Sequence, residues 1–313
     1  MPVFKIHHIT KYEYDRPVRE SVTEIKLYPY SSPLQETLHH ELVITGSPQI
    51  FHYIDYWGNR SGVFNLLAPH RVVQIDSRFV VRTIRNNVER IPFDSYLKNL
   101  LEIARNNLAL LELSAPRPVK NADAMKSLVA QFFHPDKSIA QAIKDCSELV
   151  NTTFEYHKGI TDTQTTIDEL LEQKAGVCQD FAHMMLELLR MVGIPCRYTS
   201  GYVCPNKKGL RGEGATHAWV EAFIPGHGWT GIDPTNNVWV TDKHVKLAVG
   251  RDFTECTPVK GAFKGPARES LSVFVSVSYE DGQQFDELTQ VKLSKEATSP
   301  EIDVESFAGQ QQQ

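Results

Sequence analysis

Residues 175 to 195 carry the feature that most constrains how this chain can fold, a helical pattern with one strongly apolar side. Gly193-Ile194-Pro195 ends the pattern, because proline cannot continue a helix and pushes the residue before it toward extended geometry. A helix with such a side packs it against the rest of the protein. The apolar residues at helical spacing are Phe181, Met184, Met185, Leu188, Leu189 and Val192.

Cys178 lies in the first turn of this predicted helix. It precedes Phe181 by three residues and Met185 by seven, so its thiol points toward the packed side. Unpaired backbone N–H groups and the positive end of the helix dipole favour a thiolate there, which lowers the pKa below the free value of about 8.5. Asp180 acts in the opposite direction, so a reactive thiol needs a positive partner. The alternative is a small buried apolar residue, the usual state of a free cysteine.

Two predicted strands further along the chain supply a candidate partner. Residues 216 to 224 and 229 to 233 read as strands, and the segment between them has turn chemistry. A turn centred on Pro225 places His217 directly opposite Asp233, whereas a turn centred one or two residues later places them diagonally or further apart. The register stays open, but it permits an aspartate to orient a histidine. A nucleophile, a base and an orienting carboxylate are the parts that covalent acyl chemistry needs.

Three separated blocks resemble the catalytic blocks of the transglutaminase-like superfamily: GVCQDFAH at 176 to 183, THAWVE at 216 to 221 and GWTGIDPTN at 228 to 236. The resemblance covers roughly residues 165 to 279 and is closest to a bacterial branch described as cysteine proteases. It implies a papain-like α+β core. It also implies Cys178 as nucleophile, His217 as base and Asp233 as the residue that orients the base.

The resemblance implies attack of the thiolate on an amide or ester carbonyl, which forms an acyl-enzyme. The backbone N–H of the cysteine is one donor for the oxyanion, and Gln179 or the hydroxyl of Tyr156 is a candidate second donor. Trp219 and Trp229 are candidate cleft residues, although at least one of them is better explained as a core aromatic. Water as acceptor gives a peptidase or amidase, and an amine gives a transglutaminase. We expect hydrolysis, with a non-catalytic peptide-binding module as a further alternative.

The N-terminal region, residues 1 to 88, reads as an all-β domain. Its alternating strands and short turns predict a sandwich or barrel-like sheet of about six or seven strands. Bacterial members of the family often carry such a domain before the core. We expect a linker or junction over 89 to 120, because prolines interrupt it, and a catalytic core over 121 to 282. An alternating strand near residues 271 to 279 should close that core, and a polar tail follows over 283 to 313.

The charge and composition of the chain limit the classes of partner that we expect it to bind. The net charge of −5 gives no basic field, so a nucleic acid is not expected. No apolar run is long enough to span a bilayer, and the first residues lack signal-peptide features, so we expect no membrane association and a cytoplasmic location. Five widely spaced cysteines argue against disulfides and zinc, and adjacent histidines on a strand point to opposite faces. We therefore expect no metal or cofactor, and a peptide or protein substrate; the oligomeric state is left open.

Overall fold

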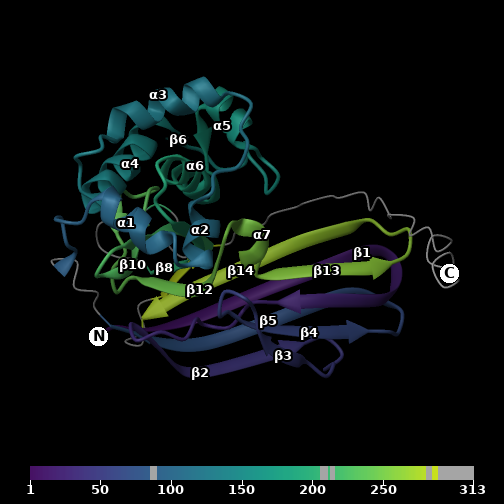
Figure 1. Cartoon of the computed structure of the whole chain (residues 1–313). Helices are drawn as coiled ribbons and strands as arrows, with labels where there is room; N and C mark the ends of the chain where they lie inside the picture. Colours follow the sequence, from purple (N-terminus) through teal and green to yellow (C-terminus); the bar gives the residue numbers. More distant parts are fainter. Residues whose placement is uncertain (85–89, 205–210, 212–215, 280–283, 288–313) are drawn as a thin grey trace, which may run out of the picture.

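The structure is a computed structural model that describes residues 1–84, 90–204, 211, 216–279 and 284–287. Its fold is α+β, with an eight-stranded sheet, a five-stranded sheet and a layer of helices on the second sheet (Figure 1). A pair of two-residue strands lies between helices. Among the described residues, no helix has both the length and the apolar character needed to cross a bilayer.

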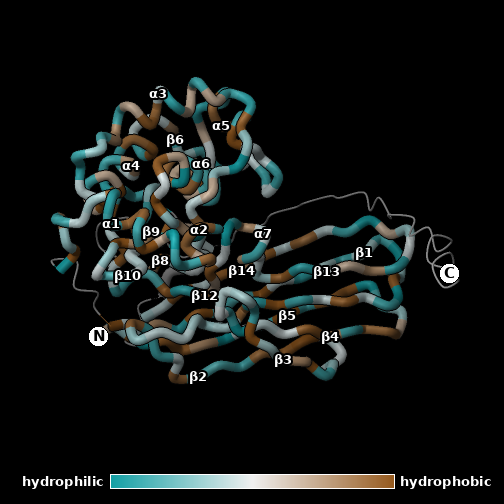
Figure 2. The backbone as a smooth tube through the Cα atoms, viewed as in Figure 1, coloured by the Kyte–Doolittle hydropathy of each residue, from teal (hydrophilic) through white to brown (hydrophobic). Residues whose placement is uncertain are grey.

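The N-terminal region builds most of the large sheet. Its strands are β1 (Val3–Ile25), β2 (Gln35–Ile44), β3 (Phe51–Ile54), β4 (Arg60–Leu66) and β5 (His70–Thr83). The first part of β1 pairs with β5, and its second part pairs with β4. Figure 2 shows polar and apolar segments alternating along these strands, as expected where one side of a strand is buried.

The sequence Arg16-Pro17 predicts a break between two strands, but this prediction is wrong, because β1 is one long strand. The pairing of β1 with β5 loses its regular register between Glu13 and Val18. Pro17 lies inside this irregular stretch, so its missing N–H removes no regular ladder bond.

The C-terminal strands return to the same sheet, which differs from the sequence-based expectation. These strands are β13 (Val259–Lys264), β14 (Glu269–Tyr279) and β15 (Gln284–Glu287). β14 runs antiparallel to β1 from Phe4, opposite Tyr279, to Tyr14, opposite Glu269. The segment 271–279 was expected to close the catalytic core, but it completes the N-terminal sheet instead. Alternation predicts a strand but does not identify its partner, so a core boundary at residue 282 does not follow the sheets.

The smaller sheet has the strand order β11-β10-β9-β8-β12. Its strands are β8 (Cys196–Val203), β9 (Thr216–Ile224), β10 (Gly228–Asp233), β11 (Val238–Trp239) and β12 (His244–Gly250). Helix α6 (Cys178–Met191) packs on β8 and β9, and Phe181, Met184 and Leu188 are fully buried there. The helix predicted from apolar spacing is therefore confirmed, and it forms the centre of the helical layer (Figure 1).

The remaining helices surround α6 or connect it to the sheets. They are α1 (Leu97–Ala104), α2 (Leu108–Ser114), α3 (Ala122–Phe132), α4 (Ile139–Thr153), α5 (Ile167–Gln173) and α7 (Phe253–Cys256). The expected linker over 89–120 contains α1 and α2. Arg190 Nε donates to the carbonyl of Leu113, and the N–H of Arg117 donates to Glu187 Oε2 at 2.7 Å. These bonds attach the described part of this segment to α6.

Candidate active site

The start of α6 is shaped by a side chain that the sequence analysis treated only as an opposing charge. Asp180 Oδ2 accepts the N–H of Val177 at 2.8 Å and the hydroxyl of Thr161 at 2.7 Å. A Cβ on Gly176 would lie 2.6 Å from this oxygen, so glycine is needed to let the carboxylate fold back over the helix start. Burial raises the pKa of Asp180, while its hydrogen bonds act to lower it. The result is a fixed backbone immediately before Cys178.

Cys178 is the first residue of α6 and is partly exposed. The other four cysteines are fully buried, and burial raises the pKa of each thiol: Cys146, Cys196, Cys204 and Cys256. Cys178 is thus the cysteine that a reagent or a substrate can reach without local unfolding.

His217 and Asp233 form a buried pair across β9 and β10. These strands pair Gly228 with Ile224, so the turn is centred on Gly226 and His217 lies diagonal to Asp233. This is one of the two registers that the sequence left open. His217 Nε2 lies 2.8 Å from Asp233 Oδ2, and both side chains have 0% exposure.

The His217 ring also interacts with Cys178. Nδ1 is buried and makes no conventional hydrogen bond to any residue that the structure describes. His217 interacts electrostatically with Cys178. Because Asp233 already binds Nε2, Nδ1 is the ring nitrogen left to interact with the sulfur. The three residues named from the sequence blocks therefore lie together, in the order sulfur, imidazole, carboxylate.

Charge favours a protonated imidazole in this arrangement. Burial opposes a charge on His217, but Asp233 and Cys178 outweigh it and raise the pKa of His217 to about 10. Burial likewise opposes a charge on Asp233, yet its interactions with His217 and His244 hold the pKa of this carboxyl well below its usual range. A cysteine beside such an imidazolium has the positive partner that thiolate formation needs.

Backbone and amide donors fix the Asp233 carboxylate. Its Oδ1 accepts the N–H groups of Thr235 at 3.0 Å and of Asn236 at 3.3 Å. Its Oδ2 accepts the side-chain amide of Asn236 at 2.7 Å. The segment that follows β10 thus folds back over Asp233, the last residue of that strand. Strand periodicity does not predict this contact.

A second histidine reaches the same carboxylate. His244, the first residue of β12, places Nε2 at 3.4 Å from Asp233 Oδ2. Trp219 is fully buried between the two imidazoles, with ring centroids 6.5 Å from His217 and 5.3 Å from His244. Trp219 is therefore a core aromatic of the site and not an exposed cleft wall. The sequence analysis missed His244, because it belongs to none of the three blocks.

The other predicted residues divide into two groups. Trp229 packs against Phe223 at 5.5 Å and under the Arg197 guanidinium at 4.4 Å, near the β9–β10 turn. Tyr156 pairs with Gly176 in the short parallel sheet of β6 (Glu155–Tyr156) and β7 (Ala175–Gly176), which places it beside the start of α6. Gln179 follows the cysteine and is partly exposed. Tyr156 and Gln179 thus stay candidates for the oxyanion donor by position.

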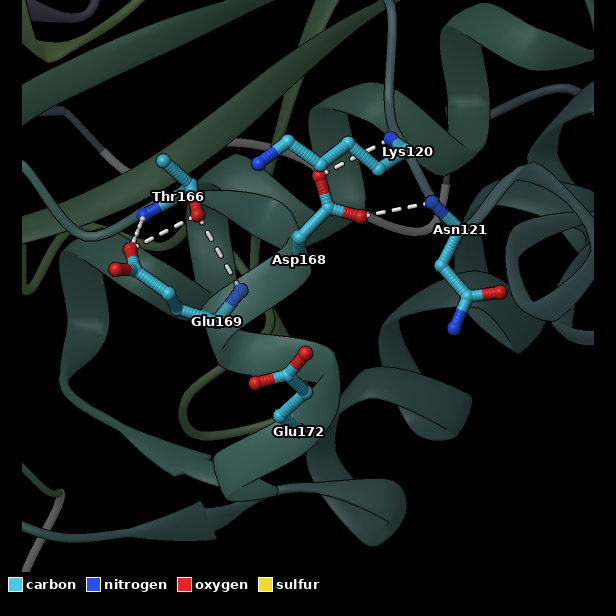
Figure 3. Close-up of a pocket in the computed structure, with 6 residues that line it drawn as sticks. All are labelled: Lys120, Asn121, Thr166, Asp168, Glu169 and Glu172. Atoms are coloured by element: carbon cyan, nitrogen blue, oxygen red, sulfur yellow. Dashed lines mark hydrogen bonds between the residues drawn. The ribbon is translucent and has the colours of Figure 1, made fainter.

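An acidic pocket of about 530 Å³ lies between α5 and the start of α3 (Figure 3). Its residues are Lys120, Asn121, Thr166, Asp168, Glu169 and Glu172. Asp168 accepts the N–H groups of Lys120 and Asn121 and so joins α5 to the start of α3. Glu169 forms a capping box with Thr166 at the start of its own helix. Within the described ranges, no three His, Cys, Asp or Glu side chains converge as metal ligands would.

Comparisons with known proteins show which families and proteins this chain resembles. A family model of the transglutaminase-like superfamily matches residues 126–234, and one of the bacterial transglutaminase-like N-terminal region matches residues 4–82. An uncharacterized protein of Mycobacterium leprae is 33% identical over 280 residues, which cover 88% of this chain and 98% of that protein. A protein-glutamine gamma-glutamyltransferase of Pseudomonas aeruginosa is 38% identical over 76 residues, 23% of this chain and 11% of that protein.

A solved structure shares the fold over nearly the whole chain. The crystal structure of a "putative cysteine protease" from Cytophaga hutchinsonii superposes with a TM-score of 0.71 at 22% identity. The match covers 94% of this chain and 95% of the other. At this identity the likeness concerns the fold, including the β-rich N-terminal region and the core.

Proposed function

This chain belongs to the transglutaminase-like superfamily, and we propose that it is a thiol-dependent acyl-transfer enzyme acting on a peptide or protein substrate. In this proposal Cys178 is the nucleophile, His217 the base and Asp233 the residue that orients the base. The observation that carries the proposal is the buried His217 ring, which binds Asp233 through Nε2 and interacts electrostatically with the partly exposed Cys178.

The proton moves through one nitrogen. His217 Nδ1 takes the proton of the Cys178 thiol, and the thiolate attacks the carbonyl carbon of the substrate. The negative oxygen of the tetrahedral intermediate lies near the helix start, where the N–H of Cys178 has no intrahelical partner. When the C–N bond breaks, Nδ1 returns its proton to the leaving amine and a thioester remains. Gln179 and Tyr156 are the proposed sources of a second oxyanion donor.

We favour water as the second acceptor, so that the enzyme hydrolyses peptide or side-chain amides. Nδ1 then takes a proton from water as the hydroxide attacks the thioester carbon. The C–S bond breaks, Nδ1 returns the proton to the Cys178 sulfur, and the product leaves as a free acid. This preference follows the bacterial branch that the three sequence blocks resemble, whose members are described as cysteine proteases.

A second candidate is transfer of the acyl group to an amine. The Pseudomonas aeruginosa relative is named a protein-glutamine gamma-glutamyltransferase, and its similarity spans 76 residues of this chain. The same three residues serve both reactions, so the acceptor has to be determined by experiment.

A partition assay separates these reactions. A glutamine-containing peptide is incubated with and without a primary amine, and the products are weighed by mass spectrometry. Deamidation or backbone cleavage supports hydrolysis, whereas efficient incorporation of the amine supports a transglutaminase. Cys178→Ala and His217→Ala should abolish turnover, and Asp233→Asn should lower kcat by about 10²- to 10⁴-fold.

His134→Ala is the matched control, because His134 is 70% exposed and pairs only with Asp136 among the salt bridges of the described residues. Its turnover should equal that of the wild type. Absence of turnover on every amide or ester, together with slow alkylation of Cys178, would favour a non-catalytic peptide-binding module over the proposed enzyme.

A further inference from the structure

Two buried imidazoles share one carboxylate in this protein, and the proposed mechanism uses only one of them. We propose that His244 is a positioning residue that holds Asp233 and thereby sets how strongly His217 binds its proton. The inference rests on the proposed function for its catalytic meaning, but its central measurement does not require turnover.

The tautomer of His244 is set by its neighbours. Nδ1 accepts the backbone N–H of Thr241 at 3.3 Å, so this nitrogen carries no proton. The ring proton therefore lies on Nε2, which faces Asp233 Oδ2 at 3.4 Å. The side chain of His244 is 1% exposed and that of Asp233 is 0% exposed, so water does not compete for this contact.

The N-terminal region holds the strand that carries His244. The hydroxyl of Thr83 donates to the carbonyl of Asp242 at 2.7 Å, two residues before His244. Gln35 and Asn59 bind the backbone of β12 further along. The His244 ring packs nearly perpendicular to Trp219, which also lies against His217. His244 is thus fixed through its backbone, through its ring contact with Trp219 and through Nδ1.

The charged and titratable groups around the site define what His244 can change. Asp233 faces His217 of β9 and His244 of β12, and His217 faces Asp233 and Cys178. Tyr198 of β8 interacts with Cys178 and with Asp180 of α6. Each donor on Asp233 Oδ2 stabilises the carboxylate and weakens its attraction for the proton of His217.

The direction of the effect follows from what remains when His244 is removed. Thr235 and Asn236 still donate to Asp233, so the carboxylate stays in place but becomes more basic. The protonated form of His217 is then stabilised further, and its pKa rises. A more basic imidazole gives up its proton less readily, so the step in which neutral His217 activates water becomes slower at neutral pH.

Three substitutions separate the effect of the hydrogen-bond donor to Asp233 from the effect of the size of the ring. His244→Phe removes the donor and keeps a ring on Trp219. His244→Asn places an amide near the Nδ1 position, where it reaches Thr241 but not Asp233. His244→Gln extends an amide to the Nε2 position and restores a donor to the carboxylate. If the Phe variant fails to fold, the Asn and Gln variants still decide the question.

The experiment is an NMR titration of the His217 ring in full-length protein with labelled histidine, assigned with His217→Ala. We expect the pKa of His217 to rise by about half a pH unit or more in the Phe and Asn variants and to return toward wild type in the Gln variant. The basic limb of the pH dependence of turnover should move to higher pH as well, with kcat lowered and KM little changed. An unchanged or lowered pKa of His217 in folded Asn and Phe variants would overturn the inference.

The titration and the turnover assay also keep the two proposals apart. A shifted pKa of His217 in a protein that turns over no acyl donor would support the role of His244 toward Asp233 and contradict the proposed enzyme. Normal turnover and an unshifted pKa in the Asn and Phe variants would do the reverse.

Discussion

Cys178 differs from the other cysteines in access to solvent, and this difference is directly testable. The remaining four thiols have 0% exposure and raised pKa values. Limiting iodoacetamide should therefore modify Cys178 at least about tenfold faster than any other cysteine. Peptide mass spectrometry gives the site of labelling. Uniform labelling, or preferential labelling of Cys146 or Cys256, would contradict the assignment of the nucleophile.

At the residue scale, sequence reasoning found the residues that lie inside short blocks and missed those that reach the site from outside them. Cys178 begins α6, His217 lies at the start of β9 and Asp233 ends β10, so their types and spacing carry a signal. The place of His244 depends on how the chain passes from β11 at one edge of the sheet to β12 at the other, because β12 is not a neighbour of β10 in the strand order. Periodicity within one strand contains no information about that crossing.

At the scale of single elements, two side-chain amides close the free edge of β12. Gln35 exchanges hydrogen bonds with the backbone of Lys246, both at 2.8 Å. Asn59 does the same with the backbone of Val249, at 2.7 and 2.8 Å. Each amide thus acts as a short piece of neighbouring strand. This protects an edge that would otherwise present unpaired backbone groups.

Removal of either amide should therefore destabilise the protein. Gln35→Ala removes the partner of the Lys246 N–H, while the Lys246 carbonyl still accepts the N–H of Tyr30 at 3.0 Å. Asn59→Ala removes the hydrogen bonds to both backbone groups of Val249. We expect a loss of about 1–3 kcal/mol in the free energy of unfolding from each substitution. Gln131→Ala is the control, because this exposed amide, among the described residues, bonds to the Ser127 carbonyl of its own helix. Its effect should stay within about 0.5 kcal/mol. Urea unfolding measures all three, and equal losses would contradict the role given to the amides.

Elements with strong periodicity were predicted well, and elements near prolines were not. The apolar spacing of α6 and the strand patterns of β9 and β10 led to bounds close to those observed. Helix α2 was not predicted, because Pro116 and Pro118 indicated a break in regular structure. The helix ends at Ser114, just before these prolines. Pro17 suggested a break in β1, but the strand passes through an irregular stretch of its pairing. A proline lacks a backbone N–H donor. Whether this ends a helix or strand depends on how the residues around the proline are paired.

At the scale of the whole molecule, the two ends of the chain meet in one sheet. β14 lies between β1 and β15, and its Val275 and Val277 are buried with residues of β1 and β5 in the core of that sheet. The divisions at 88, 120 and 282 followed changes in composition along the chain. Pairing between segments at opposite ends leaves no local trace in sequence, so the return of β14 could not be predicted from alternation alone.

This placement predicts where a defect in β14 appears. Val277→Asp buries a charge in the large sheet, so hydrogen exchange should increase most in β1 and β5. Ser270→Asp is the control, because Ser270 is exposed at the other end of the same strand. Hydrogen-exchange mass spectrometry compares the two variants. Faster exchange confined to β9 and β10 would instead support the earlier expectation that this strand closes the catalytic core.

The most direct test of the account is the detection of an acyl group on Cys178. Full-length protein is mixed with an activated ester, quenched in acid and analysed by intact and peptide mass spectrometry. We predict that the wild type carries one acyl group on Cys178, that Asp233→Asn acylates more slowly, and that Cys178→Ala carries none. Acylation of Cys178→Ala to the same extent as the wild type, or a wild-type protein that is never acylated at Cys178, would contradict it.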